Sequence, residues 1–191
     1  MNYDTGCYSH VGRTDKDELR KWANTNNKTW YTDGQPINLE RRGCMSRSTI
    51  THEMIHALGY YHEQSRPDRN ESVIIKYANI IQKHWHNFEW HGNTFTFGVP
   101  YDLTSIMHYK WDAFSKSRGH LPSIIPKKQG ISQTLIGSSL VPTIWDIEKI
   151  KRMYDCNSKF RDKIPYSDVF HYLEIDYQNL RLVKWLFHNH F

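Results

Sequence analysis

Residues 52–63 of this chain read HEMIHALGYYHE, and this stretch carries most of the functional information in the 191-residue sequence. On a helix, His52 and His56 lie one turn apart and point the same way, so both imidazoles can reach one metal ion. Gly59 permits a positive φ and a sharp turn, which brings His62 round as a third ligand. The spacing therefore predicts a three-histidine metal site where a helix ends.

Three neutral nitrogen ligands with an open fourth position are typical of a catalytic zinc site. Glu53 stands beside the first histidine, so its carboxylate can accept a proton from a water in the open position. A bare His-Glu-x-x-His occurs by chance, and a lone helical histidine is usually a surface or core residue. The longer pattern fixes five positions, and at ~5% per residue type a chance match is expected in about one in ten thousand chains of this length. We therefore expect one Zn²⁺ per chain, bound by His52, His56 and His62, with Glu53 as the general base.

The same pattern is the metzincin signature, and its continuation resembles one metzincin family. Glu63 follows the third histidine and continues as QSRPDR, which is similar to the astacin family of zinc metalloendopeptidases. A second block, SIMHY at residues 105–109, resembles that family's Met-turn. The resemblance implies that Met107 forms an apolar floor beneath the metal. It also implies that Tyr109 is a weak additional zinc ligand that swings away to hydrogen-bond the tetrahedral intermediate. Without the resemblance, a Met and a Tyr in a turn are more often core residues.

The resemblance implies an α+β fold of the metzincin, zincin-like type. In that fold a twisted sheet and two helices lie above a horizontal cleft, and an irregular C-terminal lobe lies below it. The strand at Cys7, Tyr8 and Ser9 would form the upper rim of the cleft, to which a peptide substrate adds as an antiparallel strand. We expect an astacin-like peptidase domain at residues 1–156 and a tail of unassigned structure at residues 157–191.

The sequence departs from the family pattern upstream of the rim strand. Only six residues precede Cys7, so we expect the family's early strands and first helix to be missing and the upper lobe to be incomplete. The family's mature N-terminus lies near the glutamate that follows the third ligand, and Glu63 is expected to lose that partner. Residues 14–38 are polar, which we interpret as a long surface insertion.

The three cysteines imply one odd thiol. The family resemblance pairs Cys7 with Cys44. It pairs the cysteine that ends the last helix, here Cys156, with one upstream of the rim strand that is missing here. Two interpretations of Cys156 stay open: a small buried apolar residue, or a thiol left without its partner.

Apolar spacing predicts three helices. The first spans about 46–58, the second about 78–89, and the third begins at Thr143, which can cap it, and ends near Cys156. Residues 92–142 hold many Gly, Pro and Ser and are expected to form loops and turns. The positions expected to be buried are Ile50, Met54, Ala57 and Leu58 in the first helix, Ile80, Ile81, Trp85 and Phe88 in the second, and Ile144, Ile147, Ile150 and Met153 or Tyr154 in the third.

Composition excludes several classes of protein. The 7 Trp, 12 Tyr and 8 Phe are too many for a chain that stays unfolded. Lys+Arg 25 against Asp+Glu 20 gives a net charge of +5 without a clustered basic stripe, so nucleic-acid binding is not expected. No apolar stretch is long enough to span a membrane, and the start of the chain has no signal-peptide pattern. Asn27 and Asn70 are candidate glycosylation sites, and with the family resemblance they favour a secreted protein.

Two functions from different classes fit these observations. The first is a zinc metalloendopeptidase that hydrolyses protein or peptide substrates with a water that Glu53 activates at the zinc. The alternative is a catalytically impaired, truncated astacin-like module that binds zinc or a partner. The intact histidines and Glu53 favour the enzyme, whereas the missing upper lobe favours the module and predicts a poor or inactive protease.

Overall fold

The structure is a computed structural model of the chain, and it describes residues 5–25, 35–92, 94–154 and 156. The expected tail at 157–191 lies outside the described residues. The chain divides into a unit that ends at Ile150 and a second unit that begins at Lys151. Small sheets and helices alternate along the first unit, as expected for an α+β fold.

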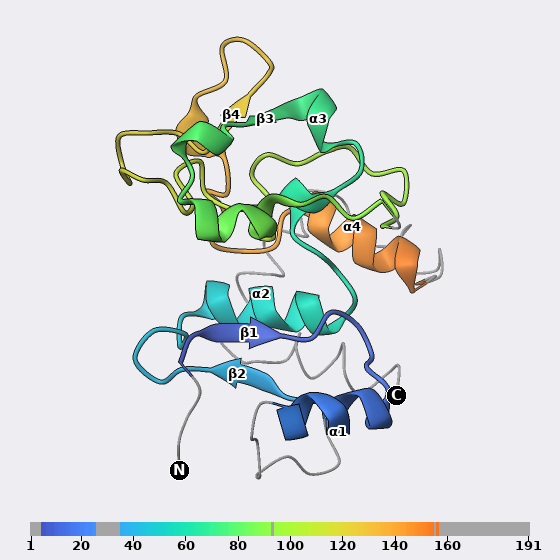
Figure 1. Cartoon of the computed structure of the whole chain (residues 1–191). Helices are drawn as coiled ribbons and strands as arrows, with labels where there is room; N and C mark the ends of the chain where they lie inside the picture. Colours follow the sequence, from blue (N-terminus) through green and yellow to red (C-terminus); the bar gives the residue numbers. More distant parts are fainter. Residues whose placement is uncertain (1–4, 26–34, 93, 155, 157–191) are drawn as a thin grey trace. The chain divides into compact units, whose positions relative to one another are not determined.

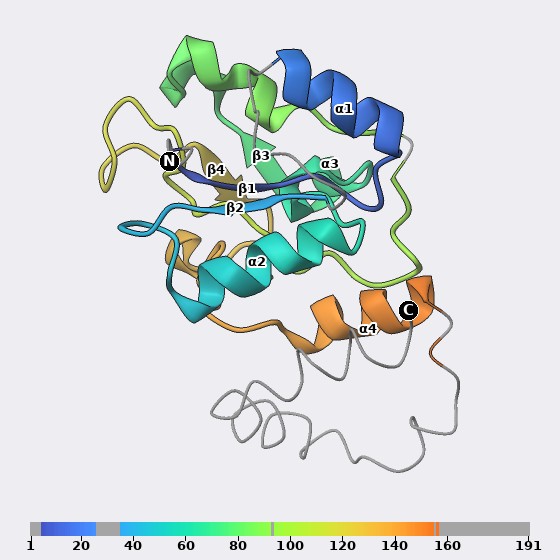
Figure 2. The same ribbon diagram turned by 90° about the horizontal axis from the view of Figure 1, so that it is seen from below.

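The upper-rim strand is present and has a partner. β1 (Cys7–Ser9) pairs antiparallel with β2 (Ile37–Leu39), and helix α2 (Arg47–Ala57) packs against both strands (Figures 1 and 2). A disulfide joins Cys7 to Cys44 in the loop before α2, which confirms the expected pairing. The two strands and the helix are thereby tied together.

The interpretation of residues 14–38 as a surface insertion is wrong for their described part. This segment contains helix α1 (Lys16–Thr25) and strand β2. Leu19 and Ala23, one turn apart on α1, are each only 3% exposed. The Trp22 ring lies edge-on to the ring of Tyr8 in β1, with centroids 6.4 Å apart. The polar residues of the segment form the outer face of an amphipathic helix, and its few apolar side chains face inward.

Helix α2 begins and ends as predicted, but it buries a different face. Its N-cap is Ser46, whose side chain accepts a hydrogen bond from the Thr49 N–H, and its C-cap is Leu58. Glu53, Ile55 and His56 are the buried residues, whereas the four predicted positions Ile50, Met54, Ala57 and Leu58 are half-buried. The prediction failed because β1 and β2 cover one side of the helix and an apolar cluster around Ile55 covers another, so no single apolar stripe exists.

A second two-stranded sheet contributes to the main apolar core. β3 (Val73–Ile75) pairs antiparallel with β4 (Ile124–Pro126), and each contributes one fully buried residue. The core consists of Val73, Ile80, Phe88, Ile124 and Ile136. Short elements surround it: η1 (Glu63–Ser65), α3 (Arg69–Ser72), η2 (Tyr77–Asn79), η3 (Gln82–Phe88) and η4 (Gln133–Leu135). The rest of residues 92–142 forms loops and turns, as predicted.

The predicted helix at 78–89 is replaced by the two 3₁₀ helices η2 and η3. Ile80 and Phe88 are fully buried as predicted, but Ile81 and Trp85 are about two-fifths exposed, at 39% and 42%. A 3₁₀ helix has three residues per turn, so apolar residues spaced for an α-helix do not stay on one side of it.

The last helix, α4 (Ile144–Met153), has the predicted cap and an unpredicted buried face. The Thr143 hydroxyl accepts from the Asp146 N–H, and the Asp146 carboxylate accepts from the Thr143 N–H. The two buried residues of α4 are Asp146 and Lys149. The expected apolar positions are wrong, since Ile144, Ile147 and Ile150 are half-buried and Met153 and Tyr154 are exposed. Polar partners elsewhere in the fold account for this inversion, as described below.

Among the described residues, we find no helix with the length and apolarity needed to cross a membrane.

Candidate metal centre

Three imidazoles converge as the sequence predicts. His52 and His56 come from α2, and the chain turns at Gly59, where φ is +105°, to bring back His62. The Nε2 atom of His62 lies 3.2 Å from the Nε2 atom of each of the other two. Two nitrogens bound to one tetrahedral zinc at 2.0–2.1 Å would lie about 3.3 Å apart. The three residues therefore fit one zinc ion.

Backbone carbonyls fix the orientation of the first two rings. The Nδ1 atom of His52 lies 2.8 Å from the Ile106 carbonyl oxygen, and that of His56 lies 2.6 Å from the Tyr60 carbonyl oxygen. A carbonyl only accepts, so Nδ1 carries the proton and the Nε2 lone pair is left for the metal.

Burial keeps the three rings neutral. It lowers the pKa of His52, lowers the pKa of His56 to about 4, and lowers the pKa of His62 well below its ordinary value. Charge repulsion among the rings acts in the same direction on His56 and His62. A metal binds the neutral imidazole, so these side chains are in the ligating form at neutral pH.

Glu53 is the ionisable residue directly after the first ligand. It is 5% exposed, and its Oε2 atom is buried with no hydrogen-bond partner among the described residues. Burial raises the pKa of Glu53 to about 7. A carboxyl group that titrates near neutrality can both accept and release a proton, which suits a general base.

The Met-turn residues Met107 and Tyr109 contact residues within or next to the histidine cluster. Met107 is buried in an apolar cluster with Ile55, and its carbonyl oxygen accepts from the Glu63 N–H at 2.9 Å. The ring of Tyr109 packs against that of His62, with centroids 4.4 Å apart. Burial, with a smaller effect of the Glu53 charge, raises the pKa of Tyr109 to about 12, so its hydroxyl remains a donor at neutral pH.

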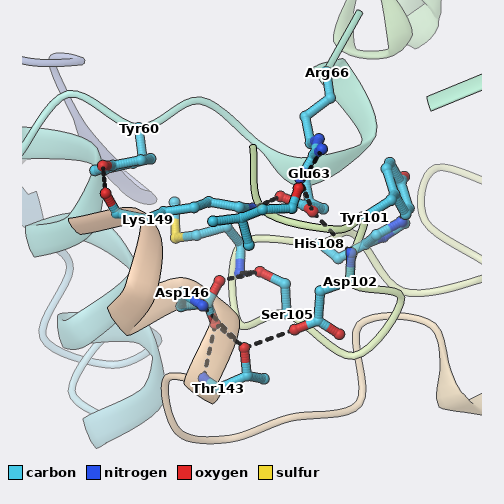
Figure 3. Close-up of polar contacts among 12 residues, drawn as sticks. Tyr60, Glu63, Arg66, Tyr101, Asp102, Ser105, His108, Thr143, Asp146 and Lys149 are labelled. Carbon is cyan, nitrogen blue, oxygen red and sulfur yellow. Dashed lines mark hydrogen bonds and ion pairs between the residues drawn. The ribbon is translucent and has the colours of Figure 1, made fainter. Parts of the chain in front are cut away.

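Glu63 has three partners that the sequence did not predict. Its Oε1 atom accepts from Arg66 Nη1 at 3.1 Å and from the Asp102 N–H at 2.9 Å (Figure 3). Its Oε2 atom accepts from Lys149 Nζ. Sequence reasoning missed Lys149 because it assigned the buried side of the last helix to apolar residues only. The signal that could have found it is Asp146, which lies one turn before Lys149 on the same face of α4.

Gln64 was also missed. It is fully buried, and its side-chain oxygen accepts from the Tyr109 N–H at 3.0 Å. The residue after Glu63 thereby holds the backbone of the Met-turn tyrosine.

The remaining predicted sites are the rim strand, the two candidate glycosylation sites and Cys156. The Gly12 N–H, just beyond the rim strand, donates to the His56 carbonyl oxygen at 2.9 Å, which joins that strand to the metal-binding helix. Asn70 is exposed in α3, whereas Asn27 lies outside the described residues. Cys156 is a free cysteine and half-buried.

Comparisons with known proteins agree with this geometry. The family model described as Astacin, a peptidase family, matches residues 1–155. In Oryzias latipes, the low choriolytic enzyme is 42% identical over 65% of this chain and 44% of its own length. High choriolytic enzyme 1 from the same fish is 38% identical over 80% of this chain and 48% of its own length. An astacin-like metalloprotease toxin of Loxosceles intermedia is 36% identical over 78% of this chain and 51% of its own length.

The chain thus spans about half the length of these curated relatives. The solved structure of high choriolytic enzyme 1, described as a hatching enzyme zinc-protease, superposes with a TM-score of 0.65 at 36% identity. The match covers 81% of this chain and 66% of that one. The family match over residues 1–155 and the shared fold lead to one conclusion: this chain belongs to the astacin family of peptidases.

Proposed function

We propose that the chain is a zinc-dependent endopeptidase that hydrolyses peptide bonds in protein or peptide substrates. One observation carries the proposal: three neutral imidazole nitrogens converge beside the buried Glu53 carboxyl group, which has an unpartnered oxygen among the described residues. Relatives described as a hatching enzyme zinc-protease and a metalloprotease toxin support the reaction class.

Glu53 would move the proton. A zinc ion held by His52, His56 and His62 would lower the pKa of a bound water molecule to about 7 and polarise the carbonyl of the scissile bond. Glu53 Oε2 would take the proton of the attacking water and then deliver it to the leaving amine. In the zinc-free chain burial raises the pKa of Glu53 to about 7, which makes its carboxylate a stronger proton acceptor than an exposed one.

Tyr109 would stabilise the charge that develops on the former carbonyl oxygen. Its hydroxyl keeps its proton because the pKa is about 12, so it can donate a hydrogen bond to an oxyanion. Its ring rests on His62, and its backbone N–H is held by Gln64. These contacts keep the phenol beside the metal ligands while leaving the hydroxyl to the substrate.

We also propose that the protein works outside the cell. The Cys7–Cys44 bridge suits an oxidising compartment, and the exposed position of Asn70 suits its glycosylation. Glycopeptide mapping of the chain secreted from eukaryotic cells is expected to find a glycan on Asn70.

The test of the enzymatic proposal is casein hydrolysis by the purified full chain before and after treatment with a zinc chelator. We expect cleavage to stop on chelation and to return when one equivalent of zinc is added. Cleavage that persists in the metal-free chain would contradict the proposal. A chain that binds zinc fully and cleaves nothing would instead favour the alternative of an impaired zinc-binding module.

A further inference from the structure

We propose that Lys149 is a positioning residue of the metal centre, and that the polar face of α4 to which it belongs supports all three zinc ligands. The inference rests on the proposed function, since it concerns the same metal site. Figure 3 shows this face, with Asp146 directed toward Ser105 and Thr143, and Lys149 toward Glu63.

A single intervening residue connects each zinc ligand to α4. The Ile106 carbonyl oxygen, which contacts His52, belongs to a residue whose N–H donates to the Asp146 carboxylate at 3.1 Å. The Tyr60 carbonyl oxygen contacts His56, and the Tyr60 hydroxyl donates to the Lys149 carbonyl oxygen at 2.7 Å. These two links use one side chain and one backbone group of α4.

The third link is a buried ion pair. His62 is followed directly by Glu63, whose carboxylate accepts from Lys149 Nζ. The side chains are only 2% and 7% exposed, so water screens their interaction weakly. The Glu63 N–H also donates to the Met107 carbonyl oxygen. The backbone that carries His62 is therefore held at the adjacent residue from both its main chain and its side chain.

Lys149 balances the charge of the buried cluster around Glu63. Arg66 pairs with Glu63 at 3.1 Å and with Asp68 at 2.7 Å, so it already divides its charge between two carboxylates. Lys149 is the other cation that contacts Glu63 in the described part of the chain, and it brings this cluster to two positive and two negative charges. Without it, one oxygen of a 2% exposed carboxylate would lose its partner. Removing one member of a buried pair is costly, whereas neutralising both members is often tolerated.

The test is the zinc dissociation constant of the full chain, measured by competition with a chromogenic chelator. Lys149→Met keeps most of the side-chain length and removes the charge, and we expect it to weaken zinc binding on the order of tenfold, the lower end for groups that support metal ligands. The double variant Glu63→Gln/Lys149→Met removes both charges, and we expect it to recover most of this loss. Lys149→Arg is expected to bind nearly as the wild type. The matched control is Lys83→Met, which removes an exposed lysine of η3 and is expected to have no effect.

The cobalt-substituted proteins give a second measurement, which reports on ligand geometry rather than folding. The visible absorption bands of the cobalt form are expected to shift in Lys149→Met and to return in the double variant.

Wild-type zinc affinity and an unchanged cobalt spectrum in Lys149→Met would overturn the proposal. So would a double variant as weak as the single one, because the effect would then come from packing. If Lys149→Met does not fold, the double variant and Lys149→Arg decide, and failure of both to bind zinc normally overturns the proposal. A chain that passes these binding tests but hydrolyses no peptide would refute the proposed function alone.

Discussion

The residues of the metal centre owe their chemistry to burial. The same desolvation that keeps His52, His56 and His62 neutral raises the pKa of Glu53 to about 7. Burial thus lowers the pKa of the ligands and raises the pKa of the base, because it disfavours whichever form carries the charge.

The loss of one ligand should remove the metal. His56→Ala leaves two of the three nitrogens and an unfilled space beside them, and two histidines are a much weaker site for zinc. Elemental analysis after dialysis is expected to find well under one zinc per chain. His120→Ala, which removes an exposed histidine, serves as the control and is expected to keep full occupancy. Full zinc in His56→Ala would show that the ligands are assigned wrongly.

Tyr109→Phe should slow the reaction without removing the metal. The variant loses a hydroxyl donor whose pKa of about 12 keeps it protonated, while Glu53 and the three histidines remain. We expect kcat to fall by at most about 10²-fold, with KM little changed, since one oxyanion donor acts mainly in the transition state. Steady-state kinetics on a fluorogenic peptide would measure both constants. An increase confined to KM would assign Tyr109 to substrate binding instead.

At the residue scale, the sequence predicts the ligands and the base but not what supports them. His52, Glu53 and His56 follow from a helical spacing of one turn, which is a local rule. The Glu63–Lys149 pair joins residues 86 positions apart, and no local rule specifies such a contact. The same holds for the Gln64 side chain and the Tyr109 N–H.

Among the elements, the two-stranded sheet of β1 and β2 depends on its neighbours. Two paired strands alone are marginal in water, so β1 and β2 need α2 and the Cys7–Cys44 bridge to hold them. The pairing with β2 leaves β1 better supported than the sequence suggested.

The disulfide should contribute measurably to stability. Its cysteines are 37 positions apart, and closing such a loop stabilises the folded chain by roughly 3–4 kcal/mol in the chain-entropy treatment. Urea unfolding of Cys7→Ser/Cys44→Ser is expected to show a loss of about this size, against little change in Cys156→Ser. Equal stability of the double variant and the wild type would mean that packing alone holds the β1–β2 sheet.

Helix ends were predicted better than helix faces. The Ser46 cap of α2 and the Thr143–Asp146 capping box of α4 are local hydrogen-bond patterns that the sequence states directly. The face that a helix buries depends on what surrounds it. On α4, partners distant in sequence bury Asp146 and Lys149 in place of the isoleucines.

For the whole molecule, pH should act through the buried histidines. His56 and His108 each have a pKa of about 4 in the folded chain against an ordinary 6.5, so the unfolded chain binds protons that the folded chain does not. Their contribution to stability is present above pH 6.5 and is lost as the pH falls toward 4. Glu53 acts in the opposite sense, because its pKa of about 7 lets the folded chain bind a proton first.

His56 and His108 against Glu53 give a net loss of stability for the zinc-free chain of roughly 1.5 kcal/mol between about pH 6.5 and pH 5, and the lowered pKa values of His52 and His62 add to this loss. Urea unfolding of the zinc-free chain at these two pH values measures it directly. Stability that is equal or greater at the lower pH would contradict the neutral state of the buried histidines in the folded chain.

The central claim, that Glu53 drives hydrolysis at a three-histidine zinc site, is tested most directly by Glu53→Gln. Zinc content and peptide hydrolysis would be measured on the same sample, beside the wild type. The amide is nearly isosteric with the carboxyl group but cannot take a proton. We therefore expect about one zinc per chain in both proteins and a rate lowered by roughly 10²–10⁴-fold in the variant. A zinc-loaded Glu53→Gln chain that keeps most of the wild-type rate would contradict the claim.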